Sequence, residues 1–177
     1  MAHKAVFLDR DGVLNKSTVR NGRPYPPSSV DKLELFETSI QACRLLAEAG
    51  YLLIGVTNQP DIARGKTAKH VVDQINTTVK EVMGLDALRV CPHDDADNCS
   101  CRKPKPGMLL EAARSFDIDL SSSIMVGDRW KDIEAGQAAG CRTVLIDYGY
   151  DEAGSRHVDY VCPSLLDATP WITGVSP

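Results

Sequence analysis

Short apolar runs that alternate with helical patterns most constrain what this chain can fold into. The runs cover residues 4–8, 51–57, 88–91, 123–127 and 143–147, with a further short run at 158–161. Strands without polar alternation are typical of a parallel sheet that is buried on both faces. Helical patterns lie between them at 37–49, 67–83, 106–116, 132–139 and 164–172, with Thr67 expected to cap the second. The order predicts right-handed βαβ units in a doubly wound α/β fold, whose chemistry should lie beyond the carboxyl ends of the strands.

Length and composition agree with one soluble globular domain over residues 1–177. No insertion is large enough for a separate cap domain. The net charge of −4 argues against a nucleic-acid partner, which usually selects a basic surface. No apolar stretch is long enough to span a membrane, and the first residues lead directly into a strand without room for a signal peptide. We therefore expect a cytoplasmic protein with reduced thiols, no membrane partner and, because no interface signature is present, a monomeric state.

Two aspartates, Asp9 and Asp11, directly follow the first apolar run. Residues i and i+2 of an extended chain point to the same side, so the two carboxylates converge at the end of the strand. Carboxylates this close repel each other unless a cation or a shared proton compensates them. A hard divalent ion such as Mg²⁺ suits oxygen ligands, and an ionised aspartate can act as a nucleophile that forms an aspartyl phosphate. The alternative is a solvated acidic turn after a strand.

Polar residues also follow the later strands, and a parallel sheet would bring them to the same edge. They are Thr57, Asn58 and Gln59 after the second run, Arg102 and Lys103 before the third helix, and Asp128 and Asp132 after the fourth run. Each piece alone has a structural explanation: Thr57 as a turn residue, Asp128 as a helix cap, and the cations as a solvated basic loop. Together they supply a nucleophile, a metal site and stabilisers for an anion, which are the parts that phosphoryl transfer requires.

The six cysteines fall into two groups. Three are isolated in apolar surroundings and are expected to be buried free thiols: Cys43, Cys141 and Cys162. The other three, Cys91, Cys99 and Cys101, cluster with His93 in residues 91–101, here called the cysteine loop. Three thiolates and one imidazole match a structural Zn²⁺ site, although the spacing is tighter than in zinc fingers, and incidental thiols in a loop are the alternative. We expect the ion to fold the inserted loop and so to direct Arg102 and Lys103, which follow the loop, toward the substrate.

In this order, the motifs resemble those of the haloacid dehalogenase superfamily of phosphohydrolases. The resemblance covers residues 6–147 and rests on Asp-x-Asp-Gly-Val from Asp9, on Thr57, on Lys103, and on Gly-Asp-x-x-x-Asp from Gly127 to Asp132. It implies a Rossmann-like parallel sheet of haloacid dehalogenase type and the activity of a phosphoric monoester hydrolase. Asp132 would hold the second acidic position of the last motif.

The resemblance also implies a role for each matched residue. Asp9 would be the nucleophile and a Mg²⁺ ligand, and Asp11 would be the general acid and base, with its backbone carbonyl on the metal. Thr57 and Lys103 would stabilise the transferring phosphoryl group, while Asp128 would complete the Mg²⁺ site. Asp11 would protonate the leaving sugar oxygen and then activate the water that hydrolyses the aspartyl phosphate.

Longer motifs narrow the resemblance. They are Asp-Arg-Asp-Gly-Val-Leu-Asn from Asp9, Thr-Asn-Gln from Thr57, Ile-Ala-Arg-Gly from Ile62, Cys-Pro-His from Cys91 and Cys-x-Cys-Arg-Lys-Pro from Cys99. Together they are similar to those of the D-glycero-D-manno-heptose 1,7-bisphosphate 7-phosphatases, which serve the synthesis of activated heptose for lipopolysaccharide or surface glycans. The similarity implies a small phosphorylated sugar as the substrate, bound by Arg10, Asn58, Gln59 and Arg102.

The segment after Asn15 departs from that family because it is longer and more basic. Residues 16–35 are expected to form a loop, and Arg20, Arg23 and Arg64 are further candidates for the non-reacting phosphate. Two alternatives from the same class stay open. One is a histidinol-phosphate phosphatase or another small sugar-phosphate phosphatase. The other is an enzyme that acts on phosphorylated nucleic-acid ends, which the net charge of −4 disfavours. From another class, a non-catalytic zinc-stabilised binding module is the alternative, and the intact set of polar strand ends argues against it.

Overall fold

A six-stranded sheet between two layers of helices forms the centre of the structure. The computed structural model describes residues 2–20, 23–150 and 157–175. The strands of this sheet are β1 (Ala5–Leu8), β4 (Leu52–Asn58), β5 (Ala87–Cys91), β6 (Ile124–Gly127), β7 (Arg142–Ile146) and β8 (Tyr160–Cys162). The helices are α1 (Glu37–Glu48), α2 (Lys69–Met83), α3 (Gly107–Phe116), α4 (Trp130–Ala139) and α5 (Leu165–Thr173).

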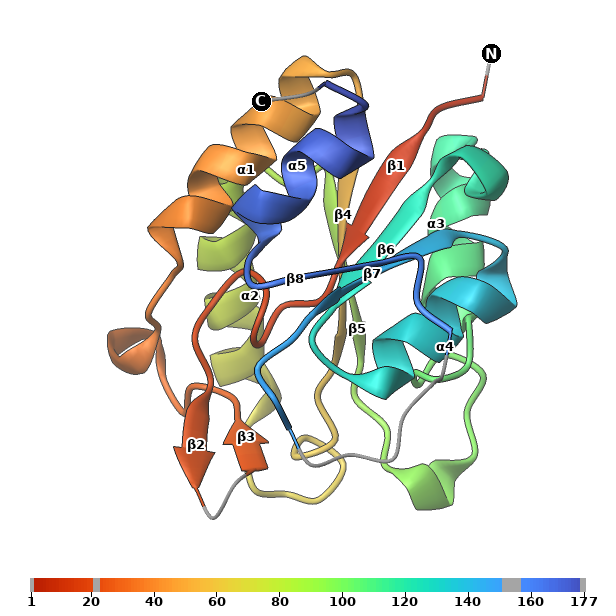
Figure 1. Cartoon of the computed structure of the whole chain (residues 1–177). Coiled ribbons are helices and arrows are strands. Elements are labelled where there is room, and N and C mark those ends of the chain that lie inside the picture. Colours follow the sequence, from red (N-terminus) through yellow and green to blue (C-terminus); the bar gives the residue numbers. More distant parts are fainter. Residues whose placement is uncertain (1, 21–22, 151–156, 176–177) are drawn as a thin grey trace.

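The strands are parallel and follow the order β5-β4-β1-β6-β7-β8. Helices α1, α2 and α5 cover one face of the sheet, and α3 and α4 cover the other (Figure 1). This arrangement confirms the doubly wound α/β fold. The chain leaves β1 in one direction along the sheet and returns to its other side with β6, so the strand order reverses between β1 and β6. In open α/β sheets, such a switch point is the usual place for a ligand.

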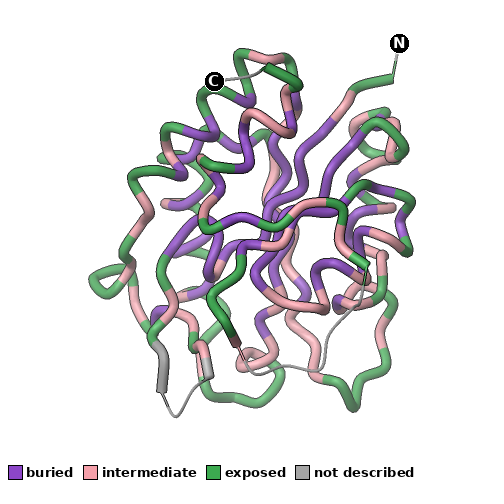
Figure 2. The backbone as a smooth tube through the Cα atoms, viewed as in Figure 1, coloured by how far each residue is buried: buried purple, intermediate pink, exposed green. Residues whose placement is uncertain are grey.

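Alternate residues of the central strands point to opposite faces of the sheet and so pack into two separate parts of the hydrophobic core. In β1, Val6 and Leu8 pack with α1, α2 and α5, whereas Ala5 and Phe7 pack with α3 and α4. All four are completely buried. Figure 2 shows the result as a buried band through the middle of the molecule, with most of the exposed residues in the outer turns of the helices and in the loops. Burial on both faces is the reason why these strands show no polar alternation.

The segment 16–35 is not a plain loop, so that expectation was wrong. Strands β2 (Thr18–Arg20) and β3 (Arg23–Tyr25) pair antiparallel as a separate hairpin, and a 3₁₀ helix, η1 (Val30–Lys32), follows. Strands of three residues, one of them containing Pro24, are too short to show a recognisable apolar pattern. The hairpin lies at the end of the molecule to which β1 points (Figure 1).

The helix cap expected at Thr67 was also wrong. Helix α2 begins at Lys69, with Ala68 in the N-cap position and no capping hydrogen bond from a side chain. The N–H of Thr67 instead donates to the carbonyl of Asp61 at 3.1 Å, which closes the loop after β4. The other expected strands and helices lie within two residues of their predicted bounds.

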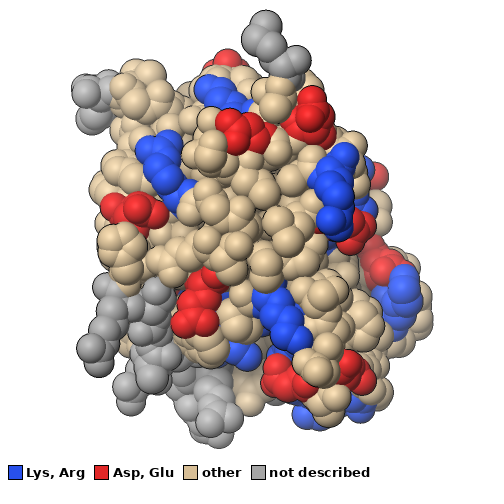
Figure 3. All heavy atoms as spheres, turned by 90° about the vertical axis from the view of Figure 1, so that its right-hand side faces the viewer, with Lys and Arg blue, Asp and Glu red and all other residues tan. Residues whose placement is uncertain are grey.

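The outer surface carries charges of both signs. On the face that lies to the right of Figure 1, acidic and basic side chains are interspersed (Figure 3). The two described ends of the chain lie at the end of the molecule opposite the hairpin (Figure 1). None of the helices within residues 2–20, 23–150 and 157–175 combines the length and apolarity that crossing a membrane requires.

Helix α4 approaches the sheet most closely at Gly136, and this contact generates a test of the packing. A Cβ at this position would lie 2.6 Å from Met125 Cβ and 3.0 Å from Thr143 Cγ2. Alanine usually stabilises a helix by about 1 kcal/mol relative to glycine. Here we expect Gly136→Ala to lower the free energy of unfolding by about 1–3 kcal/mol, because the methyl group overpacks the interface. Urea denaturation measures the change.

Ala138, which is exposed on the same helix, provides the matched control for that experiment. Ala138→Gly should cost about 1 kcal/mol from helix propensity alone. A Gly136→Ala protein that is more stable than the wild type would contradict the close helix–sheet contact.

Candidate active site

A cavity of about 580 Å³ opens at the carboxyl ends of β1, β4 and β6, next to the switch point in the strand order. The hairpin segment supplies one wall, with Ser17, Pro24, Tyr25 and Pro26. The strand ends, the loop after β4, the segment before α3 with Arg102 and Lys103, and the start of α4 supply the rest. The side chains of Arg20 and Arg23 lie outside the described part of the chain.

Lys103 lies at the centre of a buried network of charges on the cavity floor. Its Nζ lies 2.7 Å from Asp9 Oδ1 and 2.6 Å from Asp132 Oδ1, and it donates to the carbonyl of Val56 at 2.8 Å. Burial opposes the charge of the ammonium, but the neighbouring Asp132 and Asp9 outweigh it, so the pKa of Lys103 lies above its usual value. Lys103 therefore stays protonated and holds the two aspartates together.

Asp128 completes a cluster of three carboxylates. Oxygen atoms of Asp9, Asp128 and Asp132 lie within 4.8 Å of one another. Both oxygens of Asp128 are buried, and the hydroxyl of Tyr150 is a polar neighbour of the carboxylate. Gly12 makes this approach possible, because it adopts a φ of +95° and a Cβ there would overlap the Asp128 carboxylate.

The cluster contains more negative than positive charge. Three carboxylates share the ammonium of Lys103, and the guanidinium of Arg129 adds a weaker attraction at Asp128, so the negative charge is incompletely compensated. Burial raises the pKa of Asp9 to about 7, although Lys103 opposes the shift. Burial, together with the charge of Asp9, raises the pKa of Asp128 to about 9. A divalent cation with a preference for oxygen, such as Mg²⁺, would remove this repulsion and pair the buried oxygens of Asp128, so the residues present fit such an ion.

Asp11 has a different environment from Asp9. Its carboxylate accepts hydrogen bonds from Arg10 at 2.9 Å, from Asn15 at 2.9 Å and from Gln59 at 2.8 Å. It lines the cavity but is not a member of the carboxylate cluster, in which Asp132 stands as the third acid. The metal role that the sequence implies for Asp11 is through its backbone carbonyl, and it stays a prediction.

Arg10 lies behind Asp11 and not in the cavity, where we expected a substrate-binding residue. It is 1% exposed, and its guanidinium bonds to Asp11 and, at 2.7 Å, to Asn76 Oδ1 of α2. These contacts make it a residue that fixes Asp11 from the interior. Its place between two aspartates in the sequence indicates an ion pair with one of them, but nothing in the local sequence indicates the hydrogen bond to Asn76.

The end of β4 connects the two halves of the site. Gln59 Nε2 donates both to Thr57 Oγ1 at 2.9 Å and to Asp11 Oδ2 at 2.8 Å. Asn58 pairs twice with the backbone of Lys103, accepting from its N–H at 3.1 Å and donating to its carbonyl at 3.0 Å. Thr57, Asn58 and Gln59 all line the cavity, where their roles toward a substrate stay predictions. Their contacts fix Asp11 and Lys103.

Arg64 and Arg102 line the cavity but are already paired with the cysteine loop. Arg64 donates from Nε and Nη2 to both oxygens of Asp94, at 2.7 and 2.6 Å, and these bonds lower the pKa of Asp94 to about 2. Arg102 Nε donates to Asp95 at 2.7 Å. No residue of the loop itself is among those that line the cavity. The loop therefore acts on the cavity through these two arginines.

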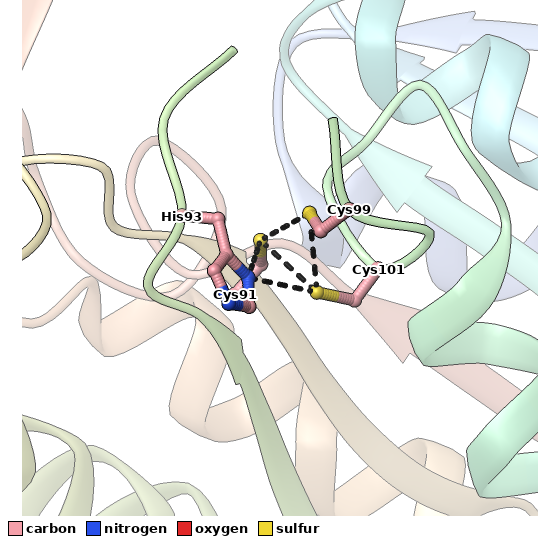
Figure 4. A group of neighbouring side chains, drawn as sticks. All are labelled: Cys91, His93, Cys99 and Cys101. Atoms are coloured by element: carbon pink, nitrogen blue, oxygen red, sulfur yellow. Dashed lines mark hydrogen bonds between the residues drawn. The ribbon is translucent and has the colours of Figure 1, made fainter. Parts of the chain in front are cut away.

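The four ligand-type residues of the cysteine loop point toward one another (Figure 4). The Sγ atoms of Cys91, Cys99 and Cys101 are 3.3–3.6 Å apart, and His93 Nδ1 lies 3.3 Å from the Sγ of Cys101. A tetrahedral zinc site with Zn–S bonds of about 2.3 Å has S···S edges of roughly 3.8 Å, whereas a disulfide bond is only about 2.05 Å long. The set therefore fits a metal ion and not a disulfide. The three isolated cysteines are buried, as expected: Cys43, Cys141 and Cys162.

Comparisons with known proteins agree along the whole chain. A family model described as HAD-hydrolase-like matches residues 100–168. The D-glycero-beta-D-manno-heptose-1,7-bisphosphate 7-phosphatase of Pasteurella multocida is 37% identical over 97% of this chain and 98% of the relative. The protein of the same name from Haemophilus ducreyi is 36% identical over 97% of this chain and 100% of its own length.

A solved structure also matches nearly the whole chain. The D,D-heptose 1,7-bisphosphate phosphatase of B. bronchiseptica, crystallised with magnesium and phosphate, has a TM-score of 0.83 to this structure. It is 29% identical in sequence, and the match covers 98% of this chain and 99% of that one.

The raised pKa values of the carboxylates predict how stability depends on pH when no divalent cation is present. A carboxyl whose pKa is higher in the folded state binds protons preferentially there, so stability falls as the pH rises through that range. For Asp9 and Asp128 the range extends from 3.8 to about 7 and about 9. Protein dialysed free of Mg²⁺ should melt at a lower temperature at about pH 8.5 than at about pH 5.5.

Asp128→Asn removes one of the titrating groups and should reduce this drop in melting temperature. Addition of Mg²⁺ to the wild type at the higher pH should restore stability. A melting temperature of the Mg²⁺-free wild type that rises over the interval would contradict the assignment of raised pKa values.

Proposed function

Because this chain belongs to the family of D-glycero-beta-D-manno-heptose-1,7-bisphosphate 7-phosphatases, of haloacid dehalogenase type, we propose that it removes the 7-phosphate of D-glycero-D-manno-heptose 1,7-bisphosphate. The family relation makes the chain a phosphoric monoester hydrolase. The proposed reaction serves the synthesis of activated heptose for lipopolysaccharide or surface glycans. A cytoplasmic location and a monomeric state stay predictions.

One observation carries the proposal: Asp9, which lines the cavity, and Asp128 are buried side by side with too little positive charge around them. Mg²⁺ is the proposed counterion, supported by the magnesium and phosphate in the B. bronchiseptica relative. Asp9, Asp128 and the backbone carbonyl of Asp11 would hold it. When bound, the ion would reduce the repulsion between the carboxylates and the incoming phosphate.

Asp9 is the proposed nucleophile. Lys103 holds its Oδ1, which leaves Oδ2 as the oxygen that attacks phosphorus. The bond between phosphorus and the sugar oxygen breaks as the aspartyl phosphate forms. Two hydrogen bonds from Asn58 fix the backbone of Lys103. The positive charge of Lys103 and the hydroxyl of Thr57 offset the negative charge that spreads over the phosphoryl oxygens.

Asp11 is the proposed general acid and base. It lines the cavity next to Asp9 and gives a proton to the leaving sugar oxygen. It then takes a proton from the water that attacks the aspartyl phosphate. Its hydrogen bonds from Arg10, Asn15 and Gln59 fix the carboxylate from three sides, so that the proton is given and taken at a defined place.

Positive charges elsewhere in the cavity support a substrate with a second phosphate. Lys66 and Lys131 line the cavity, and neither forms an ion pair with a described residue. Arg102 uses Nε for Asp95 and Nη1 for the carbonyl of His93, and it lines the same cavity. A bisphosphate would place its non-reacting phosphate among these cations.

The cysteine loop is the proposed site of a structural Zn²⁺ held by Cys91, His93, Cys99 and Cys101. Burial raises the pKa of Cys91 to about 12 without a metal, and a bound ion would deprotonate the thiol. The role of the ion is to fix the loop. Lys103 follows Cys101 by two residues, so a folded loop also fixes the start of the segment that carries Lys103.

Phosphate release from both anomers of the heptose bisphosphate tests the function. We expect Mg²⁺-dependent loss of the 7-phosphate, identified by phosphorus NMR of the product, with Asp9→Asn lower in turnover by roughly 10⁴-fold or more. Asp31→Asn, an exposed acid outside the site, is the matched control and should keep the wild-type rate. Faster turnover of histidinol phosphate than of the bisphosphate would favour that alternative, and normal activity of Asp9→Asn would refute the covalent route.

Metal analysis tests the second site. Purified protein should contain about one zinc per chain, and Cys99→Ser should lower both the zinc content and the free energy of unfolding, the latter by at least about 2 kcal/mol. Cys141→Ala removes a buried thiol elsewhere and should leave the zinc content unchanged. Equal zinc content in the wild type and Cys99→Ser would refute the assigned ligands.

A further inference from the structure

Tyr148, in the segment after β7, contacts the turn that carries the two aspartates, although the proposed reaction gives it no role. Its hydroxyl donates a hydrogen bond to the carbonyl of Gly12 at 2.8 Å. The ring of Tyr150 lies beside it, with the two ring centroids 5.7 Å apart. The side chain is 43% exposed, but partial burial of its hydroxyl, together with the charge of Asp128, raises the pKa of Tyr148 to about 12, so the hydroxyl keeps its proton and remains a donor.

The position of this hydrogen bond follows from the strand order. Strand β6 lies between β1 and β7 in the sheet. Gly12 follows β1, Asp128 follows β6 and Tyr148 follows β7. The bond from Tyr148 to Gly12 therefore spans the strand that carries Asp128 and joins its two neighbours at the carboxyl edge of the sheet.

Gly12 is the residue through which this bond acts on the acidic cluster. It directly contacts the carboxylate of Asp128, and its conformation leaves no room for a Cβ. Its N–H donates to the carbonyl of Asn15 at 2.7 Å, and its own carbonyl accepts from Tyr148, so both polar groups of its backbone are fixed. Asp9 lies three residues before Gly12, at the start of the same turn, so the bond from Tyr148 holds the segment that carries Asp9 next to Asp128.

We propose that Tyr148 is a positioning residue for the divalent cation: it holds the turn after β1 at the distance from Asp128 that a shared ion requires. Two buried carboxylates repel each other, and the Tyr148 bond opposes the movement that would separate them. Tyr148 is not among the residues that line the cavity, so it acts on the cation and not on the sugar. The inference rests on the proposed function only in so far as Asp9 and Asp128 bind a divalent cation.

Tyr148→Phe tests the inference because it removes only the hydroxyl. Calorimetric titration of Mg²⁺ into metal-free protein should show binding that is roughly three- to tenfold weaker than in the wild type, which is the effect of losing one hydrogen bond. The kcat at saturating Mg²⁺ should stay within about twofold of the wild type, because the reacting groups are unchanged. Cation affinity and turnover are thereby separated.

Tyr51→Phe is the matched control. The hydroxyl of Tyr51 also donates to a backbone carbonyl, that of Ile172 at 2.9 Å, but it precedes β4 at the opposite edge of the sheet. This variant should lose stability and keep wild-type affinity for Mg²⁺. Wild-type affinity in Tyr148→Phe, or equal weakening in Tyr51→Phe, would overturn the inference. A wild-type protein that binds no Mg²⁺ would instead refute the proposed metal site itself.

Discussion

Asp9 and Asp128 lie side by side in the interior, and Lys103 is the cation that contacts Asp9 and the neighbouring Asp132. Isolated carboxylates would escape this repulsion by moving into water or by taking up protons. Here the pairing of β1 with β6 places the residues that follow both strands side by side, so the two carboxylates project from neighbouring points of the backbone. The hydrophobic core on both faces of these strands therefore stabilises an arrangement of charge that is unfavourable until a cation binds.

A second set of polar contacts fixes each reacting group from a different element. Asn58 of β4 brackets the backbone of Lys103, Arg10 holds Asp11, and the N–H of Arg129 donates to Asp132 at 3.1 Å. Groups that are already oriented need little reorganisation when charge develops during a reaction. The bracket between Asn58 and Lys103 joins residues that are 45 positions apart, so the position of Lys103 depends on the fold as a whole.

The sequence predicted the features that depend on local pattern. The apolar runs identified the parallel strands, and the polar residues at their ends identified the cavity floor, since strand order brings those ends together. Arg10 shows where this reasoning stops: its partner Asn76 lies on α2, and nothing in the local sequence of either residue indicates the pair. The β2–β3 hairpin was missed because its strands are too short to carry a periodic signal. Tyr148 was missed because its contact with Gly12 depends on the register of β7 beside β6.

The cysteine loop shows how a site that takes no part in the chemistry can still control it. The loop lines none of the cavity, yet Asp94 and Asp95 hold Arg64 and Arg102 at its rim. The loop also leads, within two residues of Cys101, into Lys103, the cation that contacts both Asp9 and Asp132. Unfolding of the loop would release both arginines and loosen Lys103 at the same time. The position of Lys103 at the end of β1 therefore depends on the order of a loop whose own residues do not line the cavity.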